Sequence, residues 1–436
     1  MKSMDELEAR NFDAVVVGSG PGGATVAREL SRRGRRVVIL ERGGEAPVRG
    51  TGSQMLGQLL VPGRSLRLTP ELLAVARGIT TGGSSIFYCA CALDPPHGML
   101  EARGVDISGA IAELKQELPY GPLADELVGP FARRLMESAV ELGHEWRKLP
   151  KLVHQERCRA ECDRCIVGCP HGAKWTAREY VDDARRHGAE LVPRARVRRV
   201  LVDGGTAFGV EAAVDGRRFA YTGRHVILAA GGIGSAVILR ESGIARAGRD
   251  FFVDPLVFVV GAVDDVDGGR ELPMATGLHL EDEDYLLADL ALPGWLWRLL
   301  AVQVLRVDRV LAHRHTLPVM VKIKDRLGGR LTASGGVRKR LGPTDRAAFR
   351  RGIGRARDIL ANAGARHVFH TWYLATHPGG TAKIGDVVSS DLETEYRNLY
   401  VCDASVIPEA WGLPPVLTLL GLGRRLANHL AGAMDA

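Results

Sequence analysis

Four cysteines fall within twelve residues of one another, in the spacing C-x3-C-x2-C-x3-C, and a proline follows the last of them. They are Cys158, Cys162, Cys165 and Cys169. The last three, with the proline, match the end of the bacterial ferredoxin run, whose thiolates bind iron–sulfur iron. Four thiolates also satisfy tetrahedral zinc. The run predicts a 4Fe–4S or 3Fe–4S cluster, with a zinc or degenerate structural site, or no metal, as the alternatives.

A glycine-rich turn near the N-terminus is the second motif with a chemical meaning. Residues 13–17 form an apolar strand, 24–33 read as a helix, and 36–40 form a second strand that ends at Glu41. Between the first strand and the helix, Gly18, Gly20 and Gly23 have the spacing at which a dinucleotide pyrophosphate approaches the backbone. An acid at the end of the second strand is placed to hold ribose hydroxyls. The unit predicts dinucleotide binding, and a purely structural glycine turn is the alternative.

Further strands must complete the sheet around this unit. Residues 197–202 and 206–213 flank Asp203-Gly-Gly205, which is a hairpin pattern. Residues 225–235 then read as a buried strand that breaks into glycines and a helix. A strand returning so late in the chain predicts a nucleotide domain that is discontinuous in sequence.

Composition and charge exclude several classes of protein. The chain has 436 residues, 46% hydrophobic and 25% charged, which is typical of a globular protein, and seven cysteines are too few for a secreted disulfide scaffold. The net charge of +7 comes mainly from scattered arginines without a nucleic-acid-binding module, so no nucleic-acid partner is expected. Residues 1–11 are polar and lack the apolar core of a signal peptide, which indicates a cytoplasmic protein.

The most apolar stretch, residues 286–306, is interrupted by Asp289, Pro293 and Arg298, so it does not fit a membrane span. A buried helix or the wall of an apolar substrate pocket is one interpretation. The other is a peripheral contact with the inner face of a membrane, with Trp295 and Trp297 at the interface.

Several blocks of sequence together carry a family resemblance. They are the N-terminal glycine motif, TGGSS at 81–85, AAGGIGS at 229–235 with SGI at 242–244, THPGGTAKIG at 376–385 and NLYVCDASVIP at 398–408. In these blocks, and in their order along the chain, the sequence resembles the glucose–methanol–choline (GMC) family of flavin oxidoreductases.

The resemblance implies a mixed α/β fold, in which a Rossmann-like FAD-binding domain accompanies a smaller substrate domain built on a β-sheet, with an inserted Cys-rich loop. The expected FAD-binding parts are 1–100, 191–258 and 376–436; the expected substrate-side helices and Cys-rich segment occupy 101–190, and the substrate domain 259–375. The residues expected to bind FAD are Gly18, Gly20, Gly23, Glu41, Gly83, Ser84, Val197, Asp403 and Pro415.

His377 falls on the family's active-site histidine, which accepts the hydroxyl proton of the substrate. An imidazole with an ordinary pKa of about 6.5 suits that role. The family's second active-site position is usually His or Asn, but here it falls on Pro414, whose side chain can neither donate nor accept. Tyr88, Tyr373 or His370 is therefore expected to supply the missing polar group.

The Cys165–Lys174 segment also resembles the iron–sulfur-bearing dehydrogenases of this family. This likeness implies an FAD-dependent dehydrogenase that oxidises a CH–OH group of a hydrophobic substrate and passes electrons through the cluster to a redox partner protein or a quinone-like acceptor. One alternative is a reductase of a C=C or C=O bond in a lipid or isoprenoid, which Pro414 favours. The other is a non-catalytic electron-transfer flavoprotein.

Overall fold

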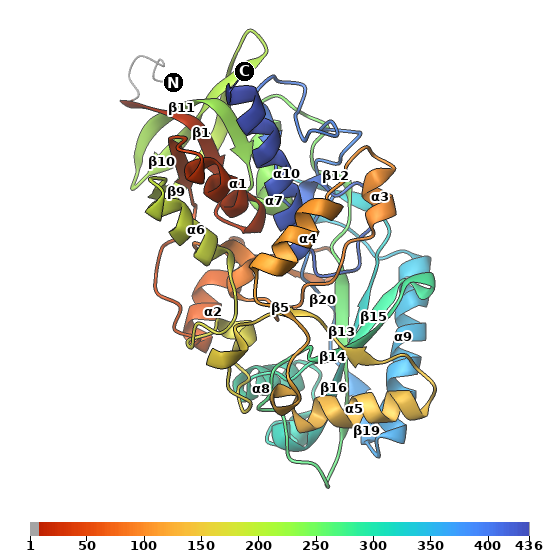
Figure 1. The fold of residues 1–436 in the computed structure, drawn as a ribbon. Helices are drawn as coiled ribbons and strands as arrows, with labels where there is room; N and C mark the ends of the chain where they lie inside the picture. Colours follow the sequence, from red (N-terminus) through yellow and green to blue (C-terminus); the bar gives the residue numbers. More distant parts are fainter. Residues whose placement is uncertain (1–7, 436) are drawn as a thin grey trace.

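Two β-sheets, one toward each end of the molecule, organise the computed structural model, which describes residues 8–435 (Figure 1). The first sheet contains β1 and β11, and the second contains β13 and β16. The chain passes between them several times, so that segments far apart in sequence meet at the junction.

The first sheet has the mixed Rossmann-like arrangement that the glycine motif predicts. Its order is β8 (Glu190–Val192), β2 (Val37–Leu40), β1 (Glu8–Val17), β11 (Arg217–Leu228), β10 (Thr206–Val214) and β9 (Ala195–Asp203), and β21 (Leu399–Val401) also pairs with β11. The pairs from β8 to β11, and β11 with β21, are parallel, whereas β10 pairs antiparallel with both neighbours. The predicted strand–turn–helix–strand unit and the 204–205 hairpin turn are both confirmed.

Helices cover this sheet and fix the glycine turn. Helix α1 (Pro21–Arg32) packs against α10 (Val416–Asp435) and α6 (Ala177–Arg186), and α4 (Ser108–Glu117) lies on α10. Helix α7 (Gly231–Glu241) follows β11 and packs on β9. The α1 helix is therefore held from both sides, which fixes the direction of its N-terminus.

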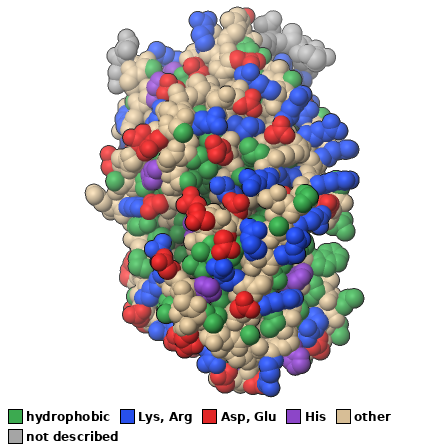
Figure 2. Space-filling view, turned by 90° about the vertical axis from the view of Figure 1, so that its right-hand side faces the viewer, with side chains coloured by type: hydrophobic (Ala, Val, Ile, Leu, Met, Phe, Trp, Pro, Cys, Tyr) green, Lys and Arg blue, Asp and Glu red, His purple; other side chains and the backbone are tan. Residues whose placement is uncertain are grey.

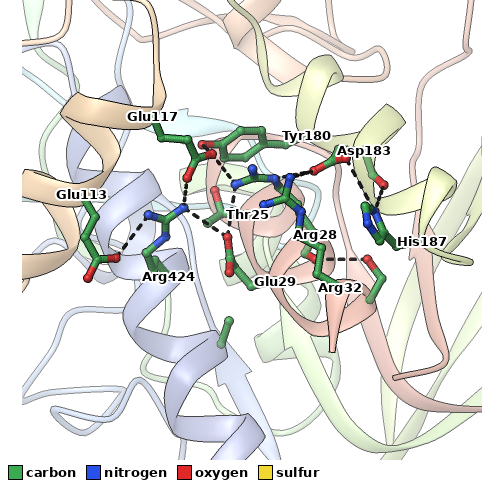
Figure 3. A network of polar contacts seen from close by, with 12 residues as sticks. Thr25, Arg28, Glu29, Arg32, Glu113, Glu117, Tyr180, Asp183, His187 and Arg424 are labelled. Carbon is green, nitrogen blue, oxygen red and sulfur yellow. Dashed lines mark hydrogen bonds and ion pairs between the residues drawn. The ribbon is translucent and has the colours of Figure 1, made fainter. Parts of the chain in front are cut away.

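A polar network joins these helices where they meet (Figure 3). Arg28 on α1 is 4% exposed, pairs with Asp183 of α6 at 2.7 Å and with Glu117 of α4 at 2.5 Å, and lies 4.1 Å from the centre of the Tyr180 ring. Arg424 of α10 pairs with Glu117 as well. The network joins four helices, and the pairing of Arg28 with two carboxylates offsets part of the cost of burying its charge.

The second sheet is long and mainly antiparallel. Its order is β3 (Leu66–Leu68), β4 (Ala74–Ala76), β20 (Leu374–Ala375), β13 (Pro255–Ala262), β16 (Thr316–Ile323), β15 (Tyr285–Asp289), β14 (Thr276–Leu280) and β6 (Arg147–Lys148), and β19 (Arg366–His370) also pairs with β13. Alternate side chains of β13 face opposite clusters: Val257 and Val259 pack under α5 (Pro130–Glu141) and α9 (Pro343–Asn362), and Leu256 and Phe258 pack with α8 (Gly294–Gln303).

The remaining elements are short. They are α2 (Gly52–Leu59), α3 (His97–Glu101), the β5–β7 pair (Tyr120–Gly121 and Lys151–Leu152) and a small sheet of β12 (Arg249–Phe251), β17 (Gly328–Leu331) and β18 (Val337–Arg338). Strands β3, β4 and β6 belong to the second sheet although they come from the first 190 residues. The domain limits expected at 100, 190, 258 and 375 stay a prediction.

The apolar stretch 286–306 divides into most of β15, a loop and α8. Trp297 is 3% exposed and its indole N–H donates to the Arg309 carbonyl at 2.9 Å, so the prediction that Trp297 lies at a membrane interface is wrong. Leu299 and Val302 on α8 and Leu305 after it are exposed. Between residues 8 and 435, no helix has the length and apolar character that crossing a bilayer requires.

Candidate functional site

One elongated cavity of about 750 Å³ runs from the carboxyl ends of β1 and β2 to the junction of the two sheets. Nine of the residues singled out in the sequence line it: Gly18, Gly20, Glu41, Gly83, Ser84, Val197, His377, Asp403 and Pro415. They come from five separate stretches of chain. The fold therefore brings the N-terminal glycine motif and the C-terminal histidine motif to a single site.

Each glycine of the turn is required for a different structural reason. Gly18 has φ +107°, and a Cβ there would lie 2.2 Å from the Ala229 carbonyl oxygen. A Cβ on Gly23 would lie 2.2 Å from the Gly18 carbonyl oxygen, so Gly23 serves close packing and does not line the cavity. A Cβ on Gly20, in contrast, would meet no protein atom within 4 Å, because this glycine faces the cavity.

The acids of the cavity are held by the backbone around them. Glu41 accepts hydrogen bonds from the N–H and the hydroxyl of Ser19 and from the Gly43 N–H. Burial raises the pKa of Glu41, and these hydrogen bonds oppose that rise. Asp403 accepts from the N–H of Gly231 at 2.8 Å and from the Ser235 hydroxyl. The two carboxyl groups thus have fixed orientations near opposite ends of the glycine turn.

Arginines without acidic partners line the same cavity. Arg42, Arg67 and Arg77 are among its walls, and the buried Nε atoms of Arg67 and Arg77 have no hydrogen-bond partner. Burial, followed by the repulsion of Arg42 and Arg67, lowers the pKa of Arg77 to about 10. Cations that face a cavity and repel one another are stabilised when an anion enters between them.

These features fit the diphosphate of FAD. The N-terminus of α1 lies at the cavity, where Gly20 and Gly22 are lining residues with a backbone N–H, and a helix N-terminus binds phosphate. Arg67 and Arg77, which donate to the Ser334 and Arg64 carbonyls and form no ion pair within residues 8–435, supply the opposite charge. Gly20 leaves the space that a side chain would fill. The residues present therefore suit the cofactor that the sequence predicts.

His377 lies at the other end of the cavity, in contact with a buried ion pair that no sequence motif reveals. Its Nδ1 is 2.9 Å from Lys322 Nζ and 3.3 Å from Asp254 Oδ2, and the lysine and aspartate are 2.8 Å apart. The other carboxylate oxygen of Asp254 accepts from the Gly412 N–H at 2.9 Å. Because Nδ1 is engaged on the protein side, Nε2 is the nitrogen left for the cavity.

Burial and the neighbouring charges determine the protonation states of His377 and Asp254. Burial first, and then the Lys322 ammonium, lowers the pKa of His377 to about 4, although Asp254 opposes the effect. Burial would raise the pKa of Asp254, but Lys322 and His377 more than offset it, so the carboxyl is held below its usual range. His377 is thus neutral at pH 7, whereas Asp254 is ionised.

Lys322 and Asp254 are the polar groups that the sequence analysis missed. Neither lines the cavity, so both act on His377 and do not supply the polar side chain that Pro414 lacks. Asp254 also accepts a hydrogen bond from the Gly412 N–H, two residues before that proline. One signal was available: Lys322 is the only charged residue in β16, which is otherwise buried and mostly apolar. A lone lysine in such a strand needs a buried partner.

The residues proposed to replace the missing group lie elsewhere. The Tyr88 hydroxyl donates to the Trp175 carbonyl at 2.8 Å, and Tyr373 packs against Phe349 with ring centroids 4.7 Å apart. His370 Nδ1 lies 3.0 Å from the Thr371 carbonyl. None of these three lines the cavity.

The four cysteines of the C-x3-C-x2-C-x3-C run do not form a ready ligand set. Cys165 is buried in an apolar cluster with Val153 and Leu272, and burial raises the pKa of its thiol to about 12. Cys158 and Cys162 are only partly buried. Within residues 8–435, no group of three or more His, Cys, Asp or Glu side chains is placed to hold a metal ion. The arrangement described here therefore does not fit an iron–sulfur cluster.

Comparison with known proteins agrees with this architecture. Two sequence models of GMC oxidoreductases match residues 104–262 and 337–423, and an NAD(P)-binding Rossmann-like domain matches 16–49. An uncharacterized GMC-type oxidoreductase of Mycobacterium tuberculosis is 27% identical over 98% of this chain and 77% of its own length. The long-chain-alcohol oxidase FAO3 of Arabidopsis thaliana is 22% identical over 97% of this chain and 68% of its own length.

Solved structures with the same fold are more distant in sequence. A pyridoxine 4-oxidase from Mesorbium loti superimposes with a TM-score of 0.72 at 18% identity, covering 96% of this chain and 99% of that one. A formate oxidase superimposes with a TM-score of 0.78 at 16% identity, covering 98% and 99%. At these identities the likeness shows the fold alone.

Proposed function

We propose, since this chain belongs to the GMC oxidoreductase family of FAD-dependent enzymes, that it oxidises the CH–OH group of an apolar alcohol. The observation that carries the proposal is the position of His377, which lines the cofactor cavity with Nδ1 held by Lys322 and Asp254. The choice of an apolar substrate is supported by the likeness to a long-chain-alcohol oxidase.

In this proposal, some residues of the cavity bind FAD and others transfer a proton from the substrate. The α1 N-terminus, Gly20 and the arginines would hold the diphosphate, and Glu41 the adenosine ribose. When bound, FAD supplies the two-electron acceptor for the hydride that leaves the alcohol carbon. His377 Nε2 accepts the hydroxyl proton in the form in which Nδ1–H donates to Asp254. Asp254 then pairs with the imidazolium, and its bond from Gly412 holds it in place.

Lys322 gives a specific reason to consider the reverse reaction. If the Lys322 ammonium donates to Nδ1 instead, the proton of a neutral His377 is on Nε2. In that form Nε2 can donate a proton to a substrate but cannot accept one. That form suits a reductase of a C=C or C=O bond, in which His377 donates a proton to the substrate and Lys322 replaces it. Both directions use the same three residues, and they differ in the tautomer of His377, whose Nδ1 either donates to Asp254 or accepts from Lys322.

Anaerobic stopped-flow mixing of the FAD-loaded protein tests the proposal. A long-chain primary alcohol is expected to bleach the flavin, and His377→Ala is expected to slow bleaching by ~10²–10⁴-fold, the usual contribution of a positioned acid or base. His370→Ala is the matched control, because His370 lies outside the cavity. Reoxidation of reduced flavin by an enone, with no bleaching by alcohols, would establish the reductase instead. No response to either would favour a non-catalytic flavoprotein.

The route by which electrons leave is a separate proposal. We retain the dehydrogenase, with a redox protein or a quinone-like acceptor, in preference to an oxidase, although the long-chain-alcohol, pyridoxine and formate enzymes described above are oxidases. The rates at which oxygen and a quinone reoxidise the reduced flavin decide between a dehydrogenase and an oxidase. The iron–sulfur cluster rests on the cysteine spacing alone, and no electron-transfer step is assigned to it.

A peripheral membrane contact through residues 286–306 also stays a proposal. It is supported by the exposed side chains of Leu299, Val302 and Leu305, which could insert into the surface of a bilayer. An apolar alcohol partitions into the same bilayer, so this contact would bring the protein to its substrate. Co-sedimentation with phospholipid vesicles, lost in Leu305→Asp, is the expected result. Equal sedimentation of the two proteins would contradict it.

A further inference from the structure

A second cavity, of about 610 Å³, is lined in part by the 329–338 hairpin and shares no lining residue with the cofactor cavity. Four arginines line it: Arg240 of α7, Arg249 of β12, Arg330 of β17 and Arg338 of β18. Asp250 is the single acid among the lining residues, and Ala245, Ala247 and Leu331 add apolar surface.

Three of these arginines stand side by side because of the strand register. Arg249 is directly opposite Arg330, and Arg330 is directly opposite Arg338, in two adjacent antiparallel pairs. Directly opposite residues project from the same face with Cβ atoms about 5 Å apart, and like charges in that relation destabilise the strands. A row of three guanidinium groups is therefore an arrangement that folding alone does not favour.

No acid among residues 8–435 forms an ion pair with the arginines of the row. In the part of the chain that the structure describes, the side chains of Arg249, Arg330 and Arg338 make no hydrogen bond or ion pair, and all three are exposed. Arg240 donates only to the Leu331 carbonyl, at 2.8 Å. Other surface arginines behave differently: Arg314, for example, forms a two-pronged pair with Asp267.

Basic side chains are common on the surface as a whole. On the face shown in Figure 2 they are dense toward one edge, but acidic side chains lie among them. The arginine row is distinguished by its concave setting and by the near absence of acids around it.

We propose that this cavity is an anion-binding site for a phosphate-bearing small molecule. Guanidinium groups bind phosphate oxygens in pairs of parallel hydrogen bonds, and three in a row can surround one phosphate or diphosphate. The apolar lining suits the organic part of such a molecule. The site is independent of the proposed redox reaction, since the two cavities are lined by different residues.

Thermal unfolding of the FAD-loaded protein, in which the cofactor cavity is filled, tests the site with inorganic phosphate and pyrophosphate as probes. At constant ionic strength, both probes are expected to raise Tm in a saturable way, and pyrophosphate at lower concentration. Without a probe, Arg330→Gln is expected to raise Tm by about one to two degrees, because it removes the middle charge of the row. The same variant is expected to weaken probe binding by about tenfold or more, which calorimetry measures.

Arg350→Gln is the matched control, because Arg350 is exposed on α9 and lies outside the cavity lining. It is expected to bind the probes as the unmodified protein does. Equal binding by Arg330→Gln, or a lower Tm of that variant without a probe, would overturn the proposal. Binding of polyglutamate or of a DNA duplex, with no response to either small probe, would also overturn it in favour of a macromolecular partner.

Discussion

Replacement of Lys322 by Met removes the charge that most directly opposes protonation of His377, so the pH dependence of the reaction is expected to change. The difference between the ordinary pKa of 6.5 and the value of about 4 corresponds to about 3 kcal/mol in favour of the neutral imidazole. Burial is the larger cause and Lys322 the second. Two unit charges 2.9 Å apart repel by about 1.4 kcal/mol even at the dielectric constant of water, which is about one pKa unit.

The pKa of His377 is therefore expected to rise by at least about one unit in Lys322→Met. A base must be unprotonated to work, so activity falls as the pH drops through its pKa. The acid limb of kcat/KM, near pH 4 in the unmodified protein, is expected to move to about pH 5 or above. The assay is the rate of anaerobic flavin reduction by an alcohol at limiting concentration, between pH 4 and 9.

Lys339→Met provides a matched control for the loss of a buried ion pair. Lys339 pairs with Asp325 at 2.8 Å, the same separation as the Lys322–Asp254 pair, and both lysine side chains are 2% exposed. Each variant is expected to lose about 3–5 kcal/mol of stability, since a buried carboxylate is left without its partner. Only Lys322→Met is expected to move the acid limb. A folded, FAD-loaded Lys322→Met with an unchanged limb, or an equal displacement in Lys339→Met, would refute the reasoning.

Three further predictions concern the cofactor, the helices and the cysteines. Gly20→Ala is expected to fold but to bind FAD at least tenfold more weakly, as measured by flavin fluorescence. Gly57→Ala is the control, because its Cβ would also meet no protein atom within 4 Å, and it is expected to keep its full FAD content. Equal FAD affinity of the two variants would contradict the assignment of Gly20 to the diphosphate site. Arg28→Met is expected to lose about 1.5–3 kcal/mol in denaturant unfolding, because the charged hydrogen bonds of a buried guanidinium are lost while Arg32 and Arg424 still pair with its two partners. A loss below about 1 kcal/mol, that of a surface pair, would show that the network is dispensable. Elemental analysis is expected to find no iron or sulfide, because the four cysteines do not form a ligand set in the part of the chain that the structure describes. Iron and sulfide that are lost in Cys162→Ser would instead establish the cluster that the cysteine spacing predicts.

The sequence by itself determined the features that depend on neighbouring residues. The strand before Gly18, the left-handed turn at that glycine and the α1 helix form one short unit, and the backbone preferences of its own residues specify it. The blocks around Gly83 and His377 are assigned through their resemblance to motifs of the GMC family, and the fold places both in the cavity.

Only the tertiary structure determined which buried polar groups meet. Lys322 and Asp254 are 68 residues apart, and the register of β16 against the chain at the start of β13 brings them together beside His377. The row of Arg249, Arg330 and Arg338 depends in the same way on the pairing of β12, β17 and β18. Sheet register is set by contacts between distant segments, and a shift of one residue turns every side chain to the other face, so no local pattern could reveal either cluster.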